Sequence, residues 1–420
     1  MGAAMLSAFY AAARPLNMWE RSAYLCLFLF PIAGLMVRHW FSLFFVALTL
    51  VLPWRFLSRR SELEVVEKRL LMIFGLVFAT SLLSAVANGA FEPFIDRLGI
   101  ELRFLLFIPL YLLISRLRYG YTVFVWGLAA SALVGFSQAM YAFFVHGEAV
   151  VGGVYNNQIF FTSVYAIVAV VLLDFAWEEK SSKVRRIVFY VCALLSASAV
   201  VMAGSRGGYV ELLALLVLWG MVRLTRIQLT GYMGIIAITA IALYFGSDRI
   251  AQRVDDAYHD VAYYLSIEDK ASHAGDLTNQ GLRMEAMRTA FLIAADNPIF
   301  GVGKGSYHEA VAQYVEKGLV NPQMNHVGHP HNAYLEMFAT KGVFGFTAFL
   351  LMLGYPISIF VRWITEGNDK AMPGLVLVAG YAIACLTESS PFIRGGFLAV
   401  FLISLAVFFA ANRRLSPSDG

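Results

Sequence analysis

The chain has 420 residues, of which 59% are hydrophobic and only 14% are charged. This composition is too apolar for a soluble globular domain and indicates a membrane protein. The formal net charge of +4 is small, and no interleaved aromatic and basic residues accompany it, so we expect no nucleic-acid partner.

About twelve apolar runs of roughly 15–25 residues, the length that crosses a ~30 Å hydrocarbon core, follow one another along the chain. Their Leu, Phe, Ala, Val and Gly content favours helices over alternating strands. We therefore predict an all-α polytopic membrane protein. The expected spans are 22–37, 40–56, 70–88, 99–115, 121–145, 157–177, 186–203, 208–224, 229–246, 333–361, 372–388 and 394–411.

Lysines and arginines of the short loops predict the orientation, because they are retained on the cytoplasmic side. With both termini on one side, that side collects nineteen of these residues, against five on the other. We therefore expect both termini in the cytoplasm. The first 21 residues include Arg14, Pro15 and Arg21 without a clean cleavage site, and we expect no cleaved signal peptide.

A polar segment, residues 247–331, separates the ninth and tenth runs and holds six of the eight histidines. The orientation places it on the outer face, which is the periplasm if the membrane is a Gram-negative inner membrane. Helical spacing of apolar residues predicts helices near 247–267 and 281–295, and a short helix ending at Lys317. We divide the chain into nine membrane helices (1–246), this periplasmic helical loop (247–331), and three further helices with a cytoplasmic tail (332–420).

The sequence shows neither a nucleotide-binding glycine loop nor a metal-binding motif. The sequence GVGKGSY at 301–307 has the wrong spacing for a Walker motif, and we interpret it as a tight turn near a ligand or a helix end. The three cysteines lie in predicted helices, and neither CxxC nor HExxH occurs. We expect no cofactor and no metal site.

His331 opens the tenth predicted membrane helix, where a side chain lies at the water–lipid boundary. A neutral imidazole there can accept a proton from a hydroxyl, so His331 is a candidate general base, with Asn332 and His329 as further candidates beside it. The alternative is a solvated capping or interfacial histidine. For His329, in a turn, that alternative is the stronger one.

Arg206 lies in GSRGG, where glycines leave backbone amides accessible and the guanidinium can bind phosphate bidentately. It could equally anchor lipid headgroups. Arg283 and Arg288 lie on the second loop helix, where the alternative is an exposed face or an ion pair of Arg288 with Glu285. Arg103, near the outer start of the fourth helix, is a weaker candidate for an anion site.

Together these residues resemble the O-antigen ligase and polymerase superfamily of bacterial envelope glycosyltransferases. The most specific part is His331-Asn332, nine residues and then Gly-x-x-Gly at 342–345, which resembles the ligase signature. Arg206 in Ser-Arg-Gly-Gly matches the superfamily's first arginine, and Arg283 in Gly-Leu-Arg-Met-Glu-Ala-Met matches its loop arginine. An alanine and a methionine stand near where many relatives carry an aromatic residue.

The resemblance implies a metal-independent glycosyltransferase of GT-C-type architecture. Its donor would be O-antigen glycan on undecaprenyl pyrophosphate, and its acceptor the terminal sugar of lipid A–core, with membrane lipids around it. His331 would act as general base in an inverting reaction, while Arg206 and Arg283 hold the pyrophosphate.

Other functions share much of this pattern. An O-antigen polymerase shares the donor and the arginine pair, and a protein O-oligosaccharyltransferase differs in its acceptor. The ligase signature favours lipid A–core. A transporter of lipid-linked sugars predicts polar residues along a path through the membrane, whereas here they gather on one face. A purely structural scaffold does not account for the arginines and the histidine.

Overall fold

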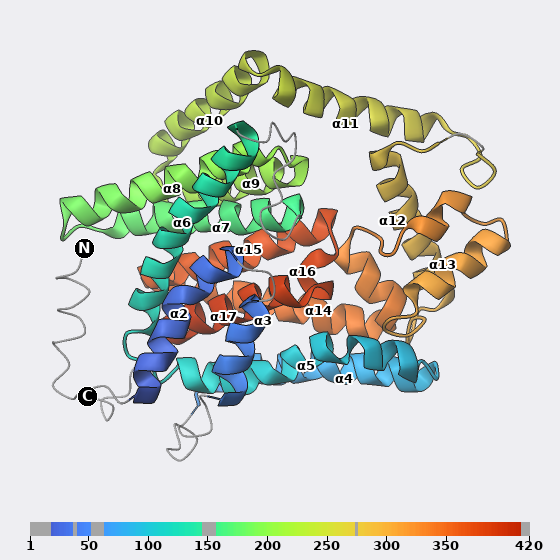
Figure 1. The fold of residues 1–420 in the computed structure, drawn as a ribbon, viewed down its shortest axis with the longest axis horizontal. Helices are drawn as coiled ribbons and strands as arrows, with labels where there is room; N and C mark the ends of the chain where they lie inside the picture. Colours follow the sequence, from blue (N-terminus) through green and yellow to red (C-terminus); the bar gives the residue numbers. More distant parts are fainter. Residues whose placement is uncertain (1–17, 37–39, 52–62, 145–156, 274–275, 413–420) are drawn as a thin grey trace.

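The computed structural model describes residues 18–36, 40–51, 63–144, 157–273 and 276–412 (Figure 1). Every regular element in these residues is a helix, as the sequence predicts. Arg14, Pro15 and several of the loop arginines that predict the orientation lie outside the described residues.

Each predicted apolar run contains a helix. These helices are α2 (Met18–Met36), α3 (Trp40–Val46) with the π-helix η1 (Ala47–Val51), α4 (Val65–Ala87), α5 (Phe91–Ile114), α6 (Gly120–Phe144), α7 (Gln158–Glu178), α8 (Lys183–Ala203), α9 (Arg206–Arg223), α10 (Arg226–Gly246), α14 (Ala333–Thr365), α15 (Met372–Thr387) and α17 (Gly395–Ala411). Among the described residues, seven helices are long and apolar enough to cross a membrane, and α3 and α17 are shorter apolar helices. The number of twelve spans stays a prediction.

The predicted helices of the polar segment are also present. They are α11 (Asp248–Ser266), α12 (Asn279–Asp296) and α13 (Tyr307–Glu316), followed by the 3-10 helix η4 (Pro322–His326). α12 packs against α14, so this segment is anchored to the bundle. α10 buries none of its residues and forms an arch with α11 at the edge of the molecule (Figure 1).

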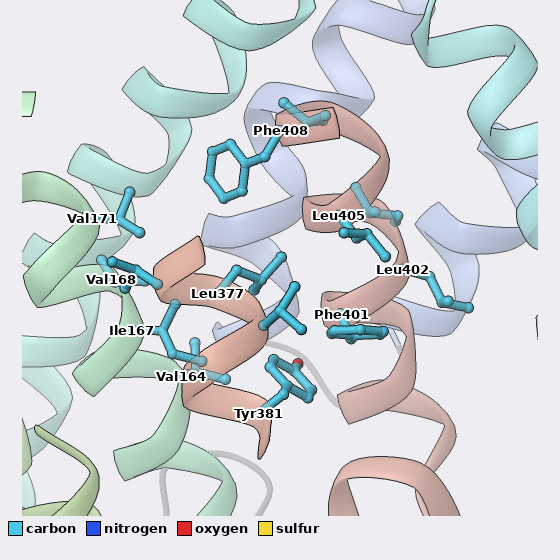
Figure 2. Close-up of a cluster of buried hydrophobic side chains, with 14 of the residues drawn as sticks. Val164, Ile167, Val168, Val171, Leu377, Tyr381, Phe401, Leu402, Leu405 and Phe408 are labelled. Carbon is cyan, nitrogen blue, oxygen red and sulfur yellow. The ribbon is translucent and has the colours of Figure 1, made fainter. Parts of the chain in front are cut away.

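Among the seven described helices that could cross a membrane, α7 is the most enclosed, because 83% of its most apolar 18-residue stretch is buried. It packs against α8, α9 and α15. Figure 2 shows side chains of α7, α15 and α17 meeting in one apolar cluster, including Val164, Ile167, Leu377, Tyr381 and Phe401. This packing holds α15 in the middle of the bundle and fixes the position of its C-terminal end.

The glycine-rich segment 301–307 and the residues before it dock into a break in α14. The break is at Gly342 (φ 63°, ψ −164°), and the next amide, of Val343, donates to Pro298 O at 2.8 Å. A Cβ on Gly342 would lie 2.1 Å from Ile299 O, so only glycine fits. The prediction of a tight turn near a helix end is confirmed.

Two short helices complete the C-terminal part. The 3-10 helix η5 (Asp369–Ala371) precedes α15, and α16 (Ser390–Ile393) follows it. α9 and α15 pack side by side in opposite directions. Arg223 at the end of α9 pairs with Asp369, just before α15, while Gly207 at the start of α9 lies beside Thr387, the last residue of α15. Each end of this pair therefore gathers polar residues from several segments.

Candidate active site at the C-terminal end of α15

His331 lies in a turn directly before α14. Asn332 is the N-cap of that helix, and its side chain accepts a hydrogen bond from the Leu335 amide at 3.0 Å. The same side chain donates to Leu386 O at 3.0 Å and so ties the turn to α15. Among the described residues, His331 is the one non-glycine residue with a positive φ (52°), which is an energetically costly conformation. The turn thus holds His331 in a strained conformation against the end of α15.

Glu388, which follows α15, is the acidic partner of two histidines. Its Oε2 lies 3.3 Å from His331 Nδ1, and its Oε1 lies 3.5 Å from His329 Nδ1. The amides of Ser389 and Ser390 donate to Oε1 at 2.9 and 3.2 Å. The Glu388 side chain is 3% exposed, against 22% and 23% for the two histidines. The carboxylate is therefore buried beneath two accessible imidazoles.

The surroundings of Glu388 keep it ionised. Burial acts to raise the pKa of Glu388, but the hydrogen bond from His331 and the charges of His329 and Arg283 outweigh it and lower that pKa to about 2. Burial lowers the pKa of His329, with Glu388 opposing this shift and Arg394 reinforcing it. At neutral pH an ionised carboxylate therefore faces the His331 ring.

Arg283, on α12, reaches the end of α15 from the polar segment. Its Nη1 donates to Thr387 O at 3.3 Å, which is its one hydrogen bond among the described residues. Its positive charge also helps to lower the pKa of Glu388. Arg283 therefore has most of its donors available beside the carboxylate.

Arg206, the first residue of α9, reaches the same end from the bundle. A Cβ on the next residue, Gly207, would lie 3.3 Å from Thr387 Oγ1. The Arg206 Nη2 and Nη1 atoms lie 3.6 Å from carboxylate oxygens of Asp256 and Asp260 on α11. Its buried Nε makes no hydrogen bond within the described part of the chain. The guanidinium is therefore loosely held by two acids of the polar segment.

The structure thus brings the three predicted residues to one end of α15. His331 reaches it through Glu388, and Arg283 donates to Thr387 O. Gly207, the residue after Arg206, lies beside Thr387, while the Arg206 guanidinium faces Asp256 and Asp260 of α11. A base with an ionised partner beside two incompletely bonded guanidinium groups can deprotonate a hydroxyl and bind an anion.

Two weaker candidates, Arg288 and Arg103, bind partners within the protein. Arg288 forms an ion pair with Glu285 at 2.7 Å, the alternative that the spacing of three residues offered. Arg103 donates to Gly395 O and, at 2.9 Å, to Ser42 Oγ, which joins three membrane helices. We interpret both arginines as braces of the fold, because their donors are engaged by the protein.

Three buried carboxylates were not singled out from the sequence. They are Glu388, Glu336, which pairs with Lys304 at 3.1 Å, and Glu101, which pairs with Lys341 at 3.0 Å. All three occur in or beside predicted membrane helices, where acidic residues are rare and costly. That rarity is the signal that could have identified them.

Fold and site together indicate a multi-pass membrane protein with a cluster of polar side chains at one end of its helices. The family model for O-antigen ligase matches residues 191–350, which include Arg206, Arg283 and His331. This match supports the resemblance to the O-antigen ligase family that the sequence motifs predicted. An uncharacterized protein of Haemophilus influenzae is 24% identical over 320 residues, which cover 74% of this chain and 77% of that protein.

Proposed function

We propose that this protein is an O-antigen ligase that transfers glycan from undecaprenyl pyrophosphate to a terminal sugar of lipid A–core. The observation that supports the proposal is that the segments carrying His331, Arg283 and Arg206 all reach the C-terminal end of α15. These residues lie within the part of the chain that matches the ligase family.

The donor's chemistry suits a site at the end of membrane helices. Its polyisoprenoid tail stays in the lipid, while its sugar stands in water. We infer that this site faces the periplasm of an inner-membrane protein with cytoplasmic termini, since the predicted topology assigns nineteen loop lysines and arginines to the opposite side and five to this one. GT-C-type architecture is part of the same proposal.

His331 takes the proton of the acceptor hydroxyl through Nε2, because its Nδ1 faces Glu388. The ionised carboxylate orients the ring and stabilises the imidazolium as it forms. Deprotonation lets the hydroxyl oxygen attack the anomeric carbon opposite the pyrophosphate, so that the configuration inverts.

The leaving group needs cations rather than an acid, because pyrophosphate departs as a stable anion. Arg206 and Arg283 bind it and stabilise its developing charge without a metal ion. Their incomplete bonding within the protein supports this role. Asn332 acts indirectly, by fixing the turn that carries His331.

A reconstituted reaction tests the assignment. The purified protein, with undecaprenyl-pyrophosphate-linked glycan, rough lipopolysaccharide and EDTA, should produce capped lipopolysaccharide on a gel. A longer lipid-linked glycan would identify a polymerase. Transfer to a pilin serine or threonine would identify a protein O-oligosaccharyltransferase, and no change of either lipid substrate would favour transport of lipid-linked sugars.

The base is tested in the same assay. His331→Ala should reduce transfer by about 10²–10⁴-fold, the usual contribution of general base catalysis. The exposed His308, on α13, provides a matched control, and His308→Ala should transfer at the normal rate. Normal transfer by a folded His331→Ala protein would exclude this role.

A further inference from the structure

The cluster of His329, His331 and Glu388 has the composition and geometry of a metal site. One ligand atom of each residue lies within 4.8 Å of the others. The two His Nδ1 to Glu388 oxygen distances are 3.3 and 3.5 Å. Metal–ligand bonds of about 2.0–2.2 Å place neighbouring ligand atoms of a tetrahedral zinc ion roughly 3.3–3.5 Å apart. Each histidine is therefore spaced from one Glu388 oxygen, Oε2 for His331 and Oε1 for His329, as two ligands of one ion would be.

The hydrogen bonding in the cluster also calls for a cation. His329 Nδ1 accepts the amide hydrogen of His331 at 3.3 Å, so this nitrogen carries no proton of its own. It nevertheless faces Glu388 Oε1 at 3.5 Å. Two atoms that both accept hydrogen bonds thus face each other, and a cation that takes the His329 Nδ1 lone pair in place of the His331 amide hydrogen relieves their repulsion.

We infer that His329, His331 and Glu388 bind a divalent transition metal, zinc in the first place, and that the bound ion inhibits the protein. Two imidazoles and one carboxylate are a common ligand set for zinc, with a fourth position left for water. The positive charges of Arg283 and Arg394, which act on Glu388 and His329, oppose the binding of a further cation.

The inhibition rests on the proposed role of His331 as general base. It follows because a metal ion bound to one ring nitrogen of His331 leaves the ring's hydrogen on the other. When the ion takes the lone pair of His331 Nδ1, the hydrogen of the neutral ring resides on Nε2. That nitrogen then has no lone pair for the acceptor hydroxyl. The hydroxyl keeps its proton, and the bond to the anomeric carbon does not form.

Metal binding is tested without any substrate. Full-length protein with a histidine-free tag is stripped with EDTA and titrated with zinc in a calorimeter, and cobalt is used to record the absorption of a tetrahedral site. Wild type and His308→Ala should bind one zinc ion per chain. Glu388→Gln and His329→Ala should bind more weakly by over tenfold, since changing even a residue behind a ligand costs about 10–100-fold.

Equal zinc affinity in Glu388→Gln, or no saturable binding by wild type, would overturn the site. Thermal unfolding of each variant shows whether a loss of binding reflects a loss of folding, and Glu388→Asp, which retains a carboxylate, should recover part of the affinity.

The inhibitory role has its own readout. Zinc should reduce transfer by the wild type and EDTA should restore it, while the zinc concentration for half inhibition should rise over tenfold in His329→Ala. Zinc that binds at one site per chain without slowing transfer would overturn the inhibition and leave the site standing. If no transfer is observed at all, the proposed function fails and the calorimetry still decides the metal site.

Discussion

α9 carries an arginine at each end, and the two arginines differ in how completely the protein binds them. Arg223 donates to Asp174 Oδ1 at 2.8 Å and to Asp369 Oδ1 at 2.6 Å, and its side chain is 7% exposed. Arg206 has two carboxylates at 3.6 Å and a buried Nε without a partner within the described residues, and its side chain is 24% exposed.

The difference separates a structural arginine from one that can bind substrate. Arg223 joins α7, α9 and η5, which directly precedes α15, and a buried charge of this kind must be fully paired. Arg206 retains donors that a pyrophosphate can use. The residue type is the same at both ends, and only the partners distinguish the roles.

The largest effect should be a loss of stability at the Arg223 end. Arg223→Gln leaves Asp174 buried without its cation, and breaking a buried pair costs about 3–5 kcal/mol of unfolding free energy. Reversible unfolding in detergent measures this change. Arg185→Gln is the control. It breaks the ion pair of Arg185 with Glu179, in which the arginine side chain is 41% exposed, and it should cost at most ~1 kcal/mol of unfolding free energy. Similar losses in both variants would contradict the comparison.

At the other end, Arg206→Lys should impair transfer and leave stability nearly unchanged. Lysine keeps the charge but loses the planar pair of donors. Removing one donor that stabilises developing charge costs about 10²–10³-fold in rate. The reconstituted assay and the unfolding experiment together check this prediction. Wild-type transfer would make Arg206 an interfacial residue.

Glu388→Gln should have an intermediate effect on transfer. It weakens the hydrogen bond that orients His331, and such bonds to charged groups contribute roughly 1.5–3 kcal/mol. The rate should fall about tenfold to a hundredfold, less than in His331→Ala. The change should appear in kcat rather than in KM for the donor, and a change in KM alone would place Glu388 in donor binding.

The smallest effect should come from the acids that hold Arg206. Asp256→Asn with Asp260→Asn removes two loose ion pairs, each worth at most about 1 kcal/mol. The KM for the donor should fall a few-fold, because pyrophosphate no longer competes with the carboxylates. An increase of KM would show that α11 helps to assemble the site instead.

The sequence alone determined the helices, because hydrophobic length and helical spacing are local properties. Each predicted membrane run and each predicted helix of the polar segment contains a helix in the structure. Residue type and family resemblance also selected His331, Arg206 and Arg283. Their catalytic and binding roles remain predictions that the experiments above can test.

Only the tertiary structure decided the partners. Glu388 is separated from His331 by 57 positions in the chain, and it becomes its neighbour because α15 ends beside the start of α14. Arg206 and Arg223 are of the same residue type and lie at the two ends of α9, yet Arg223 is paired with Asp174 and Asp369 while Arg206 Nε has no partner among the described residues. The packing of helices that are distant in sequence sets these contacts, and no local pattern encodes them.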